Sequence, residues 1–83
     1  MEAMESLLLN ALAKEFEKQQ GMHVEVHNLA SKLNIEEADI EIALKKLEEQ
    51  GLVNNYAPKG KVLLSKITWK GLEKVGEVKL KRV

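Results

Sequence analysis

The sequence contains no cysteine, one proline and only three aromatic residues in 83. The lack of cysteine excludes disulfides, thiolate zinc sites, iron–sulfur clusters and thiol catalysis, and it fits a reducing compartment. No apolar run approaches the ~20 residues of a membrane span. Glu2 and Glu5 stand where a signal peptide has basic residues. We therefore expect a cytoplasmic protein that makes no contact with a membrane.

An excess of charge is also absent, because 13 basic residues balance 13 acidic ones. The charges are nevertheless unevenly distributed, with −4 over residues 36–50 and +6 over residues 51–83. Apolar residues make up 45% of the chain and charged residues 31%, as in a globular domain. A chain of this length has too few residues for a second core, so residues 1–83 are expected to form one domain.

Groups that could carry out catalysis are missing as well. The serine and threonine hydroxyls have no histidine base and orienting acid at a recognisable spacing, and no glycine-rich loop could hold a phosphate. His23 and His27 are four residues apart, a spacing that places two metal ligands on one face of a helix. They fall instead at a predicted strand and helix start, with no third ligand nearby. We expect no enzymatic activity, no cofactor and no metal site.

The most regular stretch of the chain is residues 29–53. Leu29 and Leu33, and then Ile40, Leu44 and Leu47, follow helical spacing on either side of a break at residues 34–36. Glu36 is a poor N-cap, but acidic residues fill the first turn of the second helix, where the helix dipole favours negative charge. Gly51 is placed to end that helix. The pattern predicts a helix, a tight turn and a longer helix.

The segment before this motif predicts a helix over residues 4–20, with Met4, Leu8, Ala11, Leu12 and Phe16 on one face. Leu7, Leu9 and Ala13 widen that apolar face. Two interpretations follow: the helix is buried deeply under the motif, or it also pairs with a second subunit to form a homodimer. Residues 23–26 alternate like a short strand, after which His27 or Asn28 is expected to cap the next helix.

After the motif, residues 54–56 and 62–67 read as the two arms of a hairpin, with Pro58 and Gly60 in its turn. Thr68 is expected to cap a short helix that ends near Val75, and Trp69 is expected to pack at the edge of the core. Gly76 is expected to break this helix. Residues 78–83 alternate, which suggests a terminal strand or a loose basic tail.

These residues resemble a known architecture. The pattern of Leu29-Ala30, Leu33, Ile35, Ile40, Leu44, Leu47, Glu48 and Gly51-Leu52-Val53 closely resembles the helix-turn-helix core of the multiple-antibiotic-resistance and arsenical-resistance repressors. The segment Ile67-Thr68 with Lys70-Gly71-Leu72-Glu73 is similar to the one that follows the wing in those families. The resemblance implies an α+β fold, a single winged helix-turn-helix domain with a three-helix core, a β-hairpin wing and a short C-terminal helix.

The resemblance also implies that the second motif helix meets double-stranded DNA, through positions that match Glu37, Ala38, Asp39, Glu41, Ile42 and Ala43. Carboxylates are poor hydrogen-bond partners for most base edges, and phosphates repel them. The favourable charges lie elsewhere. The candidate nucleic-acid-binding residues are Lys59, Lys61, Lys66, Lys70, Ser31 and Lys32. We therefore expect a DNA-binding transcription regulator that uses mainly its wing, although the lysines could instead only keep a short sheet soluble.

The alternative function is that of a protein-interaction module, either an adaptor or a dimerisation domain, that uses the acidic motif helix. Ile42 distinguishes the two functions, because an isoleucine exposed among acids marks a contact surface and a buried one does not. Three aromatic residues are few for stacking unpaired bases, so no single-strand platform is expected.

Overall fold

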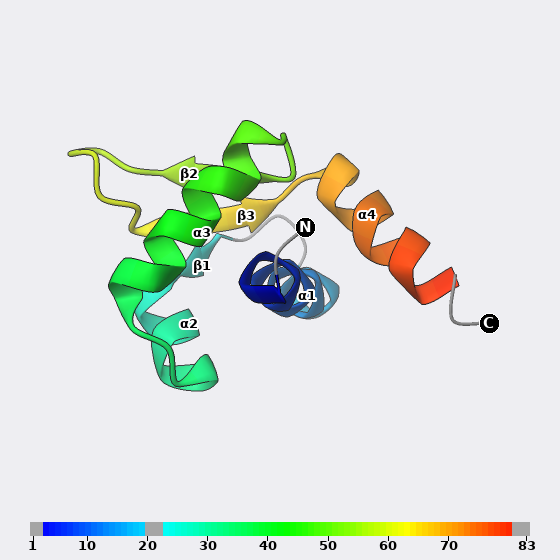
Figure 1. Ribbon diagram of the computed structural model, residues 1–83, viewed down its shortest axis with the longest axis horizontal. Helices are drawn as coiled ribbons and strands as arrows, with labels where there is room; N and C mark the ends of the chain where they lie inside the picture. Colours follow the sequence, from blue (N-terminus) through cyan, green and yellow to red (C-terminus); the bar gives the residue numbers. More distant parts are fainter. Residues whose placement is uncertain (1–2, 20–22, 81–83) are drawn as a thin grey trace.

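The helix-turn-helix forms where the sequence predicts it. The computed structural model describes residues 3–19 and 23–80, with side chains through residue 76. In it, α2 (Val26–Leu33) and α3 (Glu37–Glu49) flank a turn (Figure 1). Asn34 ends α2 in the left-handed conformation at φ 56°, which asparagine tolerates better than most residues, and its N–H donates to the carbonyl of Ala30.

The end of α3 confirms the predicted role of Gly51. Gly51 has φ 77°, its N–H donates to the carbonyl of Glu48 at 2.9 Å, and the N–H of Leu52 donates to that of Leu47 at 3.0 Å. This pair of hydrogen bonds is the Schellman arrangement that closes a helix and turns the chain into the next element. At the other end of α3, Glu36 is the N-cap and makes no side-chain capping bond, as expected.

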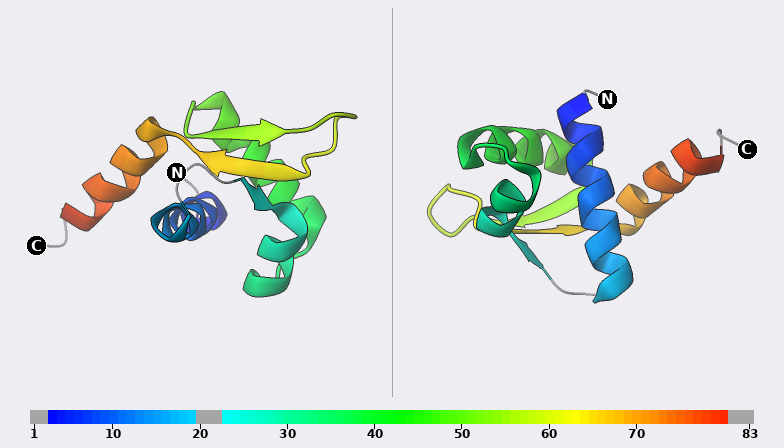
Figure 2. Two further views of the ribbon diagram at one scale, coloured as in Figure 1. Left: turned by 180° about the vertical axis from the view of Figure 1, so that it is seen from behind. Right: turned by 90° about the horizontal axis from the view of Figure 1, so that it is seen from below.

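Three strands form an antiparallel sheet in the order β1-β3-β2, from β1 (Val24–Glu25), β2 (Val53–Tyr56) and β3 (Leu64–Ile67). Tyr56 pairs with Leu64, and Asn54 pairs with Lys66. Alternation along β3 buries Ser65 and Ile67 and leaves Leu64 and Lys66 on the opposite face. Thus α1 (Ala3–Lys18) and α3 cover one face of the sheet, and no helix among the described residues covers the other, which we call the open face (Figure 2).

The core joins the three helices to the inner face of the sheet. Its most deeply buried apolar side chains, each at most 2% exposed, are Leu8, Leu9, Leu12, Leu29, Ile40, Leu44, Leu47, Val53 and Val62. Leu9 and Ala13 therefore serve the monomer's own core, and Leu7 is the exposed leucine of α1, at 45%. Glu5 is buried too, and it accepts a hydrogen bond from the Gln50 amide at 3.0 Å.

The predicted start of α2 was wrong. The helix begins at Val26, with Glu25 as an N-cap that makes no side-chain bond, so neither His27 nor Asn28 caps it. A tertiary contact sets this boundary, because the Val26 N–H donates at 3.0 Å to the carbonyl of Leu63, the residue just before β3. The strand before it is correspondingly shorter than the four residues expected.

The last helix was predicted in part. Thr68 caps it, since its Oγ1 accepts a hydrogen bond from the Gly71 N–H at 3.0 Å. However, α4 (Trp69–Leu80) continues through Gly76, so the predicted break and the terminal strand at residues 78–80 were wrong. Residues 81–83 lie outside the described part of the chain. Trp69 was also misplaced, because its side chain is 77% exposed instead of packing at the core edge.

Among the helices that the structure describes, none has both the length and the apolar character needed to cross a lipid bilayer.

Candidate nucleic-acid interface

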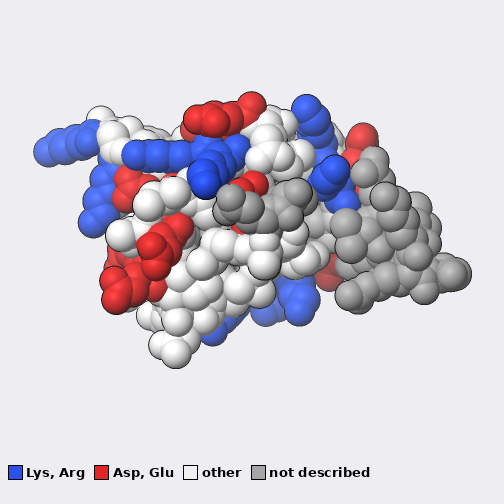
Figure 3. All heavy atoms as spheres, in the orientation of Figure 1, with Lys and Arg blue, Asp and Glu red and all other residues white. Residues whose placement is uncertain are grey.

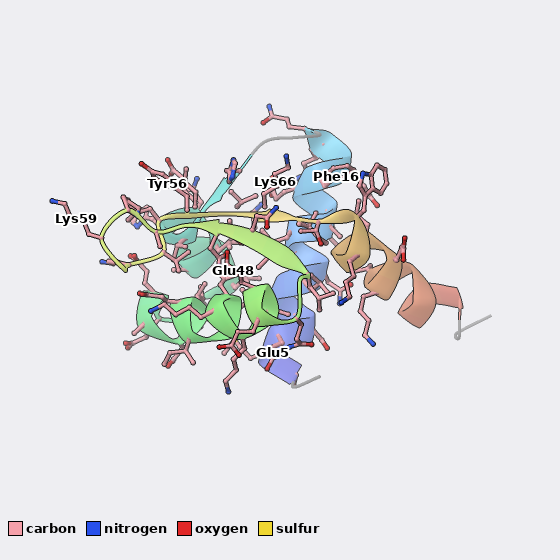
Figure 4. The ribbon with its side chains drawn as sticks, turned by 90° about the horizontal axis from the view of Figure 1, so that it is seen from above. Glu5, Phe16, Glu48, Tyr56, Lys59 and Lys66 are labelled. Carbon is pink, nitrogen blue, oxygen red and sulfur yellow. The ribbon has the colours of Figure 1, made fainter. Side chains whose placement is uncertain are left out.

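The wing, the loop between β2 and β3, projects from the body of the fold (Figure 1). It carries Lys59 and Lys61, and Figure 4 shows Lys59 pointing away from the body. The loop is closed by hydrogen bonds from the Gly60 N–H to the Ala57 carbonyl at 3.2 Å and from the Leu63 N–H to the Tyr56 carbonyl at 2.9 Å. Gly60 has φ 82°, a conformation that favours glycine, and nothing lies within 4 Å of a Cβ built there. Both lysines are exposed, and within residues 3–19 and 23–76 neither makes an ion pair.

A buried polar cluster holds the wing against α3. The Ser65 hydroxyl, which is fully buried, donates to Asn55 Oδ1 at 2.6 Å. Asn55 Nδ2 in turn donates to the Leu44 carbonyl at 3.0 Å, and the Asn55 N–H donates to Glu48 Oε2 at 3.1 Å. This cluster was not predicted from the sequence, where the inward alternation of Asn55 along β2 is the one signal that points to it.

Acidic side chains predominate at the start of α3. Ala38 and Asp39 are exposed, Glu37 is half-buried with Oε2 at 3.4 Å from His27 Nδ1, and Glu41 pairs with Lys45 at 3.3 Å. Ile42 is 56% exposed among these acids, whereas Ala43 is buried. Figure 3 shows Asp and Glu side chains at the start of α3, Lys side chains farther along it, and Lys side chains projecting at the wing end. A phosphate backbone would therefore meet favourable charge at the wing and repulsion at the start of α3.

His23 and His27 do not meet in a metal site. Within the described ranges no group of three or more histidine, aspartate and glutamate side chains could hold an ion. The contact of His27 is with Glu37, across the turn of the motif.

The structure does not gather the remaining candidate residues at the wing tip. Lys66 is half-buried on the open face of the sheet, and Lys70 passes over Gly51 at the end of α3. Ser31 and Lys32 lie on α2 near α1, where Lys32 Nζ is 2.6 Å from Glu15 Oε1. That hydrogen bond, aided by the charges of Lys32 and Lys18, lowers the pKa of Glu15 despite opposing desolvation. Lys32 is thus already paired within the domain.

Solved structures share this fold. Lactococcus lactis ZitR, described as a zinc-responsive MarR family member, matches with a TM-score of 0.70 and 26% identity over 96% of this chain and 52% of its own. Wild-type ZitR in complex with DNA matches with a TM-score of 0.68 and 26% identity, over 93% of this chain and 49% of its own.

MepR, a transcription regulator of the Staphylococcus aureus multidrug efflux pump MepA, matches with a TM-score of 0.72 and 17% identity, over 93% of this chain and 54% of its own. The chain thus spans about half the length of these neighbours. They confirm the predicted winged helix-turn-helix fold of the multiple-antibiotic-resistance repressor type.

No curated protein sequence matches the chain. A family profile does match it, over residues 1–56, which include all three helices of the core and β2. That stretch is more than half of the sequence and ends before the wing tip. The chain belongs to the family described as "Replication protein A C terminal".

Proposed function

We propose that this domain is a transcription regulator that binds duplex DNA mainly through its wing. The observation that carries the proposal is the pair of exposed ammonium groups of Lys59 and Lys61 on the projecting loop, which form no ion pair with any residue that the structure describes. Lysines that replace counterions supply most of the affinity for duplex DNA. The likeness to ZitR in complex with DNA supports the same use of the fold.

The motif helix has a minor part in this proposal. In most helix-turn-helix proteins the N-terminal half of the second helix contacts base edges. Here that half carries Glu37, Asp39 and Glu41, which lie beside the path that a phosphate backbone would follow. Coulomb repulsion between each carboxylate and nearby phosphates disfavours close docking. The wing therefore approaches the duplex while α3 stays at a distance, which gives weak binding with little base selectivity.

Substitution at the wing tip tests this function. Lys59→Ala combined with Lys61→Ala should weaken binding to a random duplex, measured by fluorescence anisotropy at low salt, by tenfold or more. Lys14→Ala combined with Lys74→Ala is the matched control, because it removes the same charge from exposed positions on α1 and α4. Equal losses in the two double variants would show that only overall charge matters and would contradict binding by the wing.

A second candidate function is favoured by the exposure of Ile42. An isoleucine that is 56% exposed among carboxylates suits a partner that presents apolar and basic side chains together. Ile42→Ser should then weaken binding of a synthetic amphipathic peptide rich in lysine and leucine, while Leu7→Ser on α1 should not. Equal binding of that peptide by both variants would argue against the interaction-module function.

A further inference from the structure

The open face of the sheet carries all three aromatic residues of the chain. Tyr56 is 52% exposed on β2, Trp69 is 77% exposed at the start of α4, and Phe16 reaches the same face from the end of α1. Figure 4 shows Tyr56, Lys66 and Phe16 in a row on the side of the sheet away from α3. Their small number predicted no stacking surface, but the fold brings them together around a lysine.

A shallow hollow of about 270 Å³ lies in this row. Its lining residues are Phe16, Asn54, Lys66, Ile67, Thr68, Trp69 and Leu72. The Phe16 and Trp69 rings meet edge to face, with centroids 6.3 Å apart and planes at 66°, so the contact with Phe16 steadies the exposed indole. The hollow is smaller than the pockets that bind drug-sized ligands. Its size therefore fits a single planar group better than a large molecule.

The polar groups of the hollow define the chemistry of its ligand. Asn54 and Lys66 pair across β2 and β3, and both lie on the open face. An amide can donate to and accept from the edge of a base, and an ammonium can neutralise a phosphate. Aromatic surface, amide and ammonium within one hollow together match a nucleotide whose base is unpaired.

We propose that the open face of the sheet is a binding site for single-stranded nucleic acid, separate from the wing tip. One base stacks on Trp69 with Asn54 at its edge, and Lys66 holds the adjoining phosphate. Tyr56 lies two residues along β2 from Asn54, about 7 Å away, and offers a second stacking surface. Glu25, which pairs with Leu64 at the edge of the sheet, is an acidic residue of this face, and Glu37 lines the neighbouring hollow beside Tyr56. Duplex DNA does not fit the site, because its bases are already stacked.

Trp69 makes the proposal directly measurable, because it is the only tryptophan in the chain. Titration with oligo-dT or oligo-U of about twelve nucleotides at low salt should quench its fluorescence, since the base stacks on the exposed indole. A duplex of equal length should leave the emission unchanged. The DNA and RNA arms identify which strand is preferred. Absence of quenching by both oligonucleotides would overturn the proposal, as would quenching by the duplex equal to that by the single strands.

Variants separate stacking from general charge. Trp69→Leu and Tyr56→Leu should each weaken binding of a labelled oligo-dT by about tenfold, with circular dichroism checking the fold. Leu7→Ala, which trims an exposed apolar side chain on α1, should leave the affinity unchanged. An equal loss in Leu7→Ala, or full binding by Trp69→Leu, would refute the site. So would an emission shift that depends on protein concentration alone, because a second copy of the chain would then cover the face.

The single-strand site and the wing do not depend on each other. Lys59→Ala with Lys61→Ala should lose affinity for duplex DNA and keep most of the quenching by oligo-dT. Glu25→Gln should strengthen binding of the oligonucleotide by about twofold, because it removes a carboxylate from the face. Weaker oligonucleotide binding by Glu25→Gln would contradict this placement of the strand.

Discussion

Asn55→Ala should destabilise the domain, because the Asn55 side chain links β2 to β3 and to α3. The change removes the hydrogen bonds of the Asn55 side chain to Ser65, at 2.6 Å, and to Leu44, at 3.0 Å. It leaves the buried Ser65 hydroxyl without its acceptor. A buried polar group without a partner costs about 1–3 kcal/mol, and the lost hydrogen bond to the Leu44 carbonyl costs a further ~1 kcal/mol. We expect the free energy of unfolding to fall by about 2–4 kcal/mol.

Urea denaturation followed by circular dichroism measures this loss, and a thermal melt should shift by roughly 10–20 °C for a domain of this size. Asn54→Ala is the matched control, because the neighbouring side chain lies on the open face and should change stability by less than about 0.5 kcal/mol. Adding Ser65→Ala to Asn55→Ala should recover part of the lost stability, since it removes the Ser65 hydroxyl that no longer has an acceptor. If Asn55→Ala and Asn54→Ala were equally stable, the polar cluster would not hold the wing.

Three further predictions concern glycine, pH and the motif helix. Gly71→Ala should destabilise the domain by at least about 2 kcal/mol, because its Cβ would stand 2.3 Å from the Leu52 carbonyl oxygen. Gly76 lies in the same helix, and a Cβ there would meet nothing within 4 Å, so Gly76→Ala should stabilise the domain by up to ~1 kcal/mol in a urea titration. A stabilising Gly71→Ala with a destabilising Gly76→Ala would refute the packing of α4. The pKa of Glu15 in the folded protein is lower than its ordinary value of 4.5. Its ion pair with Lys32 therefore stabilises the fold fully above pH 4.5, and this contribution is lost as the pH falls through the folded-state pKa. The pair is solvent-exposed, so Glu15→Gln should remove about 0.5 kcal/mol at pH 7 and nothing at pH 2, and a loss that persists at pH 2 would contradict the assignment. Glu37→Gln should leave duplex binding unchanged or raise it about twofold, and weaker binding in the anisotropy assay would point to base readout by the carboxylate.

Sequence patterns predicted the parts of the fold that depend on residues close together in the chain. The helical spacing from Leu29 to Leu33 and from Ile40 to Leu44, the left-handed Gly51 and the Thr68 cap each depend on residues about one turn apart, so they can be predicted from the sequence. The start of α2 could not, because the bond from Val26 to Leu63 joins residues far apart in the chain. A glycine lowers the helix propensity at residue 76 by only ~1 kcal/mol, and packing of Val75 against the core outweighs it.

The candidate site was harder to predict than the fold. Lys59 and Lys61 follow from the turn chemistry around Gly60, which places both on the projecting loop. The number of lysines in the sequence does not show that Lys32 forms an ion pair with Glu15 or that Lys66 lies on a different face from the wing tip. The aromatic row was missed for the same reason. Phe16 and Trp69 are 53 positions apart in sequence, and only the packing of α1 beside β3 and α4 brings their rings together.

The salt dependence of duplex binding tests the wing most directly. The logarithm of the association constant of the unsubstituted protein for a random duplex should fall linearly with the logarithm of salt concentration, with a slope of about −0.9 per phosphate contacted. Lys59→Ala with Lys61→Ala should make that slope shallower by about 1.8, while Lys14→Ala with Lys74→Ala should not change it. An unchanged slope in the wing-tip variant, or no duplex binding by the unsubstituted protein at low salt, would contradict the proposal that the wing binds DNA.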